Sequence, residues 1–174
     1  GSHLDMLHES PNCMGLAWEV DNVYWVLDGC GGHQVVDGEV GPCEAKGDIV
    51  RYDFMEDHGP GWHDHTAGSV DRYAEGVIEY VEGVPSHMQV DHDTRELFIV
   101  DSGGNRILVA NIDAGERGES LPSRDGTQAH FAWVGAEITT LVEGSAAGMQ
   151  VPSGLALYGQ YILVTDNASS TVFA

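Results

Sequence analysis

The sequence is short of positive charge. Only 7 residues are Lys or Arg against 28 that are Asp or Glu, so the formal net charge of the 174-residue chain is −21. A surface so rich in carboxylates repels phosphate groups and anionic lipid headgroups. The composition therefore argues against nucleic acid and against a membrane surface as partners. It is typical of a protein that stays soluble in a saline or extracellular medium, or of one that binds cations.

Long apolar runs and paired cysteines are scarce as well. The sequence has no run of about 18 apolar residues, so it predicts no membrane-spanning helix. Its three cysteines are an odd number, which no fully paired internal scheme satisfies. Cys30 and Cys43 flank a Gly-rich insertion and can form a disulfide that staples this loop if the protein is exported, whereas the spacing fits no Cys-x2-Cys zinc template. An extracellular or periplasmic location agrees with this pattern.

Motifs for nucleophilic catalysis are missing too. Neither Gly-x-Ser-x-Gly nor a Gly-x4-Gly-Lys phosphate loop occurs. Cys13, Cys30 and Cys43 lie in acidic surroundings, which disfavour the thiolate and hence a reactive cysteine. The sequence therefore does not indicate covalent catalysis.

What the sequence does contain is one pattern in three copies. Each copy begins at a proline and ends with an apolar, strand-like run that closes on an aspartate. The copies run from Pro11 to Asp28, from Pro85 to Asp101 and from Pro152 to Asp166. A unit that recurs with loops of different length is typical of a repeat protein.

Each unit reads as a meander of short β-strands, because runs of β-forming residues alternate with turn-rich segments. Repeated meanders stack radially as the blades of a β-propeller, which leaves only short strand edges exposed. The sequence therefore predicts an all-β fold with about three four-stranded blades. The expected divisions are 1–10 for a tag remnant and an N-terminal strand, 11–83 for blade 1 with long insertions, 84–150 for blade 2, and 151–174 for a truncated blade 3.

Two further expectations concern the fourth strand of blade 2 and the absence of helices. Its fourth strand is expected near Ala129 to Val134, or further on toward Leu141. No segment has helical periodicity, and the polar segment from Glu116 to Arg124 is broken by glycine and proline.

The second unit resembles an NHL repeat. It has a proline-led first strand from Pro85 to Asp91, an apolar second strand that ends in Asp101-Ser102-Gly103-Gly104-Asn105, and then Arg106-Ile107. The third unit is similar, with Asp166-Asn167-Ala168-Ser169-Ser170, but Thr171 replaces the arginine. The first unit keeps Asp28-Gly29 and resumes after an insertion. The resemblance covers the repeat cores, about half of the chain, and implies an NHL-like β-propeller.

NHL propellers generally close with six blades, whereas this chain encodes about three. Two copies would supply six, so the resemblance leads us to expect a homodimer that joins through blade edges into a ring. The N-terminal segment from Leu4 to Ser10 would then complete the last blade of the partner. The alternative is that the chain is a fragment of a longer ring.

In such propellers, sites usually form where first strands begin and second strands end. The resemblance therefore implies that five side chains converge at a central channel: Cys13, Asp28, His87, Asp101 and Asp166. The aspartates also have an explanation that needs no ligand, since a carboxylate after a strand can accept backbone N–H groups of the following turn. Arg106 is expected to pack or pair within its own blade.

His87 is the first candidate for metal chemistry. A neutral imidazole among carboxylates can bind a transition metal or transfer a proton. Resemblance to the propeller lyase that cleaves hydroxyglycine peptides, which holds zinc near its axis through histidines of several blades, supports this idea. The departure is that only His87 of the three aligned positions is histidine, with Cys13 as the other candidate ligand. The alternative is a solvated channel histidine.

A second metal candidate is the segment from Asp57 to His65. Its three histidines, His58, His63 and His65, lie with two carboxylates on a glycine-rich loop that can wrap a metal ion. The loop joins the third and fourth strands of its blade, so it should lie on the face opposite His87. The acidic loops can also take calcium, although no EF-hand series occurs. The alternative is a solvated acidic loop.

Two classes of function follow. The first is a binding or scaffold module that holds a protein or a small ligand on the channel face. The alternative is a metal-dependent hydrolase or lyase, similar to the lactonase, arylesterase and amidating-lyase propellers, with zinc or calcium near the channel. Whether the protein is an enzyme stays open at this point, because fold alone never fixes activity.

Overall fold

A computed structural model describes residues 10–31, 35–36, 39–40, 46–57, 65–122 and 128–174. Within these ranges nearly all regular structure is β-strand, and the only helix is the single turn α2 (Gly144–Ala147). The predicted all-β class is therefore confirmed. None of the helices described there is long and apolar enough to cross a membrane.

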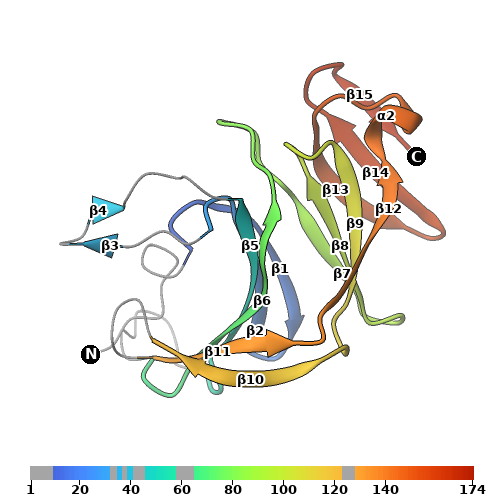
Figure 1. Ribbon diagram of the computed structural model, residues 1–174. Helices are drawn as coiled ribbons and strands as arrows, with labels where there is room; N and C mark the ends of the chain where they lie inside the picture. The colour runs from blue at the N-terminus through green and yellow to red at the C-terminus, as the bar shows by residue number, and fades with distance from the viewer. Residues whose placement is uncertain (1–9, 32–34, 37–38, 41–45, 58–64, 123–127) are drawn as a thin grey trace.

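The first sheet contains six strands in the order β1-β2-β5-β6-β11-β10 (Figure 1). Four of them form an antiparallel meander: β1 (Cys13–Val20), β2 (Val23–Asp28), β5 (Gly47–Asp53) and β6 (Ser69–Ile78). A small hairpin of β3 (Val35–Val36) and β4 (Glu39–Val40) lies in the insertion between β2 and β5.

The other two sheets repeat the meander. The second consists of β7 (Met88–Asp91), β8 (Glu96–Asp101), β9 (Arg106–Asn111) and β12 (Glu137–Glu143). The third consists of β13 (Pro152–Tyr158), β14 (Tyr161–Asp166) and β15 (Thr171–Phe173). None of the three sheets closes on itself within the described ranges, so the propeller ring stays a prediction.

The sequence left two positions open for the fourth strand of the second sheet, and the first of them is wrong. The segment Ala129–Val134 is not the fourth strand of the second sheet but β11 of the first, where it pairs in parallel with β6. Its hairpin partner is β10 (Glu116–Leu121), in a segment for which the sequence predicted no strand. At Gly135, which has a φ of 82°, the chain turns back, and β12 then pairs with β9 as the fourth strand. This strand contains Leu141, so the second expected position is confirmed. The positive φ explains why glycine stands at this reversal.

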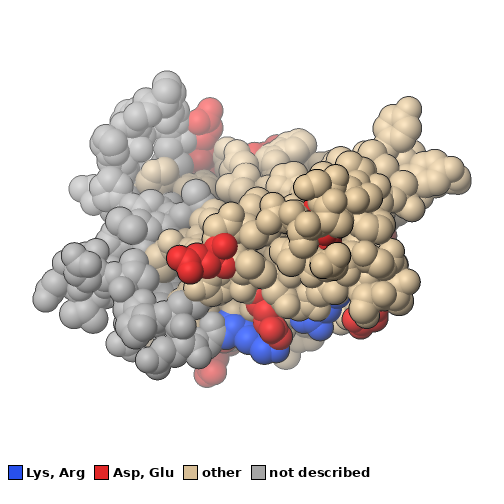
Figure 2. Space-filling model, turned by 90° about the horizontal axis from the view of Figure 1, so that it is seen from above, with Lys and Arg blue, Asp and Glu red and all other residues tan. Residues whose placement is uncertain are grey.

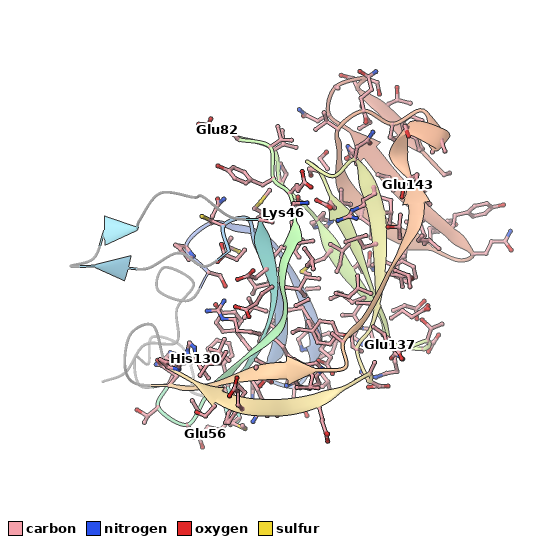
Figure 3. All side chains as sticks on the ribbon, in the orientation of Figure 1. Lys46, Glu56, Glu82, His130, Glu137 and Glu143 are labelled. Carbon is pink, nitrogen blue, oxygen red and sulfur yellow. The ribbon has the colours of Figure 1, made fainter. Side chains whose placement is uncertain are left out.

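The core is divided between the sheets, because strand residues alternate in direction. In β8, Leu97 and Ile99 join the cluster packed against the first sheet, whereas Phe98 and Val100 join the cluster packed against the third. Each fully buried side chain of this size contributes about 1.5–3 kcal/mol relative to exposure. Side chains fill the space between neighbouring sheets (Figure 3). The second sheet is therefore apolar on both faces.

The first strands of the three sheets lie side by side (Figure 1). His87 N–H donates to Ser153 O across a distance of 2.9 Å, which joins the start of β7 to β13. An ideal Cβ on Gly15 of β1 would lie only 2.1 Å from Ser86 O, so only glycine permits this approach of β1 to the second sheet. This row of β1, β7 and β13 carries the candidate site.

Candidate functional site

Two hollows open along the row of first strands. The larger, about 510 Å³, lies where β1 begins and is lined by Pro11–Met14, by Cys30 and by Tyr80–Pro85. The second, about 290 Å³, lies between β1 and β7 and is lined by residues 16–18, 87–90 and 92. We call them the Cys13 hollow and the Trp18 groove.

The Trp18 groove exposes apolar side chains to solvent. Trp18 is 51% exposed and Leu16 is 46% exposed, both on β1. The indole N–H of Trp18 donates to Asp21 O at 3.0 Å, and the ring of His92 lies with its centroid 5.1 Å away, tilted by 52°. The indole is thus held at its edge while half of its surface stays open. Such a fixed, exposed aromatic side chain is typical of a binding anchor.

His87 lines the same groove and links β7 to β13. Its Nδ1 lies 2.9 Å from Leu155 O and 3.2 Å from Leu155 N, so the backbone of β13 fixes the ring through this nitrogen. Gln89 makes a similar link, because its Oε1 accepts the N–H of Leu157 at 3.0 Å. His87 is exposed, in agreement with its place in the lining of this groove.

Cys13 lies in the other hollow, away from the residues of the Trp18 groove. Its thiol is free and exposed, and Sγ lies 3.8 Å from Gly15 O. Desolvation raises the pKa of this thiol, the contact with Gly15 O lowers it, and the charge of Asp28 raises it further. The thiol therefore stays protonated at neutral pH, in agreement with the prediction of an unreactive cysteine. Cys30 is disulfide-bonded, and Cys43 lies outside the described residues.

The three predicted channel aspartates are buried and bond to the backbone. Asp28 Oδ1 accepts the N–H groups of Asn12 and Cys30, each at 3.2 Å. Asp101 Oδ1 accepts those of Glu79 at 2.8 Å and Gly104 at 3.2 Å. Each carboxylate thereby ties the end of a second strand to a neighbouring loop. This supports a structural role for these aspartates, in which they bond to the backbone and need no ligand.

Asp166 makes the same kind of link in the third sheet. Burial by itself raises its pKa, but hydrogen bonds from the backbone of Gln150, Ser169 and Val151 outweigh this and hold the pKa of Asp166 at about 2. Their lengths are 2.6–2.7 Å. The aspartate is therefore ionised under all ordinary conditions.

Arg106 pairs within its own sheet, as predicted. Its Nε lies 2.8 Å from Asp101 Oδ2, and its Nη2 donates to Val77 O at 3.0 Å. The guanidinium thereby joins the second sheet to the end of β6.

Metal chemistry gains no support from the described part of the chain. Among those residues, no three His, Cys, Asp or Glu side chains form a group that could hold a metal ion. His58 and His63 lie outside the described residues. His65 is described, and its ring meets that of Phe54 edge-on at 5.3 Å. Zinc, calcium and a metal-dependent hydrolase or lyase stay predictions.

A network of ion pairs at the far end of β1 was not expected from the sequence. Glu19 accepts from Trp25 Nε1 at 2.8 Å, Arg51 Nε at 3.1 Å and Arg95 Nη2 at 2.8 Å. Asp71 pairs with Arg117 Nε at 2.7 Å and with Arg51 Nη1 at 3.3 Å. The only sequence signal was the rarity of arginine.

Most of the basic side chains take part in such ion pairs. Five of the basic side chains form ion pairs with carboxylates: Lys46, Arg51, Arg95, Arg106 and Arg117. In Figure 2 the Lys and Arg atoms lie together in one small area beside acidic atoms. Their partners among the described carboxylates are Glu19, Asp53, Asp71, Glu79, Asp101 and Asp113.

Comparison with protein-family models, with curated proteins and with solved structures gives no match to this chain. The functional argument therefore rests on the geometry of the chain itself.

Proposed function

We propose that the protein is a binding module that holds a positively charged, partly apolar protein segment in the Trp18 groove. The observation that carries the proposal is the half-exposed indole of Trp18, held in place by Asp21 and His92 at a groove between β1 and β7. Aromatic side chains in such positions supply a large share of the energy of protein interfaces.

The charge around the groove selects the partner. Asp21 lies in the turn that holds the indole, and Asp91 and Asp93 flank His92 in the sequence. The Oδ1 of Asp91 accepts the N–H groups of Asp93 and Thr94, which fixes the turn that carries them. An ammonium or guanidinium group at the face of an indole gains from both the ring and nearby carboxylates. A Lys- or Arg-bearing segment with an apolar residue fits this combination.

The same arrangement supports the NHL-like resemblance. Three meanders stand with their first strands in a row, and the groove lies on the side formed by these strands. In addition, the disulfide at Cys30 supports an extracellular or periplasmic location, because disulfides persist in oxidising compartments.

Binding of two synthetic peptides tests the proposal. One contains Lys, Arg and Leu, and the other has Glu in place of every Lys and Arg. We expect titration calorimetry to detect only the basic peptide, with an affinity that falls as salt rises. Trp18→Ala should weaken it at least ~10-fold.

The matched control is Tyr158→Ala, which removes an aromatic side chain that is 72% exposed on the third sheet. It should leave peptide affinity unchanged. Equal binding of the acidic peptide, or full affinity of the Trp18→Ala variant, would exclude the groove as the site.

A further inference from the structure

The three sheets follow one rule of facing. In the second strand of each sheet, the residues one and three positions before the closing aspartate point toward the next sheet in the stack. In the first sheet these positions are Leu27 and Trp25, which pack against the second sheet. In the second sheet they are Val100 and Phe98, which pack against the third. The position between them points to the opposite side.

In the third sheet, the same two positions are Thr165 and Leu163. The intervening Val164 packs against the second sheet, as the rule requires. Thr165 is exposed and Leu163 is half-buried, so they belong to a face without a neighbouring sheet in the described part of the chain. Figure 1 shows the third sheet at the end of the stack.

This face, which we call the open face, carries no charge. Pairing between the strands places seven residues on it: Gly154, Ala156, Tyr158, Tyr161, Leu163, Thr165 and Val172. Tyr158, Tyr161 and Val172 are 72%, 52% and 63% exposed. Asp166 is the only charged residue of β13, β14 and β15, and it is buried. In a chain with a net charge of −21, these three strands expose no charged residue.

The other end of the stack differs. On the outer face of the first sheet, Val26, Val50, Tyr52 and Val70 are 0–2% exposed, so this face is already covered over β2, β5 and β6. The outer face of the first sheet is therefore not available, over these strands, to pack against the open face of the third sheet. The same face of a second copy is equally apolar and equally free of charge.

We propose that the open face binds the open face of a second copy of this chain about a twofold axis. Sheets pack face to face at a distance of about 10 Å when apolar side chains meet, as the three sheets do within the chain. Most symmetric oligomers are twofold dimers of this isologous kind. Because the contact contains no carboxylate, two strongly acidic chains can meet there without like charges in contact. The Trp18 groove lies on β1 and β7 and stays free in this dimer.

Sedimentation velocity and a pair of charge variants test the proposal. The wild-type chain should form dimers in the micromolar range. Leu163→Lys and Leu163→Glu should each raise the dissociation constant at least ~100-fold. A 1:1 mixture of the two variants should recover dimers, because Leu163 lies on β14, the middle strand of the sheet, where a twofold axis through the open face brings the two copies of this residue together.

The control is Leu141→Lys, which places the same charge on a leucine of β12 that is 47% exposed. It should leave the dimer intact, and circular dichroism confirms that each variant is folded. A wild-type chain that is monomeric at ~100 µM would overturn the proposal. So would dimers that persist in both Leu163 variants, or a mixture of the two that stays monomeric.

Discussion

The second and third sheets are built from nearly the same sequence pattern, yet they end in different environments. In β8 of the second sheet, Leu97, Ile99 and Val100 are all 0% exposed. In the third sheet, Val164 is 4% exposed, whereas Tyr158 on the opposite face is 72% exposed. The comparison teaches that the repeat encodes a strand with two apolar faces. Burial of the second face then depends on a neighbour.

The two aspartate links differ in a related way. Asp101 holds two backbone N–H groups and the guanidinium of Arg106, whereas Asp166 holds backbone N–H groups at a position where the third unit has Thr171 instead of arginine. The second sheet thus adds an ion pair to a link that the third sheet makes with the backbone alone.

The largest expected effect separates the two sheets at equivalent positions. Phe98→Ala should lower the free energy of unfolding by about 3 kcal/mol or more, because it opens a cavity between two sheets. Leu163→Ala should cost less than about 1 kcal/mol in the monomer, because no sheet among the described residues covers its face. Urea unfolding at a concentration where the chain is monomeric measures both. Equal costs would show that the open face is covered within one chain.

A second comparison concerns the aspartates. Asp101→Asn should cost about 3 kcal/mol, because it leaves the partly buried Arg106 without its carboxylate. Asp166→Asn should cost roughly 2 kcal/mol, because it weakens three charge-assisted hydrogen bonds but does not remove the partner of a basic side chain. Urea unfolding at pH 7 gives the ranking. A larger loss of unfolding free energy for Asp166→Asn than for Asp101→Asn would contradict the claim that the ion pair with Arg106 adds stability to the second sheet.

A third test uses the glycines of the first strands. Gly15→Ala should cost about 2 kcal/mol, because the new methyl group would overlap the Ser86 carbonyl of the neighbouring sheet. Gly154→Ala is the control on the open face. Its Cβ would meet the side-chain Oγ1 of Thr165 at 2.6 Å, and a rotation of that side chain relieves the contact. Thermal unfolding of both variants shows whether β1 depends on this close approach.

The smallest effect is a dependence on pH. The folded-state pKa of Asp166, about 2, lies below the usual value near 4, so its stabilisation is present above about pH 4 and is lost as the pH falls toward 2. The difference in unfolding free energy between the wild type and Asp166→Asn should therefore shrink over this window. A difference that stays constant down to pH 2 would mean that Asp166 titrates alike in the folded and unfolded chains.

The sequence predicted much of the fold because its signals were local. Alternating apolar residues and turn-rich segments indicated the strands of each meander, and the recurring aspartate indicated where second strands end. The backbone role of Asp101 and Asp166, and the pairing of Arg106, also followed from local spacing.

Contacts between distant segments could not be read in this way. The hairpin of β10 and β11 joins a sheet whose other strands lie at least 38 residues earlier in the chain, and its polar sequence gave no sign of this destination. Trp18 was missed as a site residue, because an aromatic residue on a strand looks like core until its exposure is known. Cys13 and His87 were expected together, but they line separate hollows.

The parallel pairing of β11 with β6 sets an order for assembly. A chain that emerges from the ribosome residue by residue has made β7, β8 and β9 before it makes the two strands that complete the first sheet. The first and second sheets are therefore interlocked and should fold as one cooperative unit. The third sheet is not part of this unit, so a pulling force applied at the C-terminus should unfold it first.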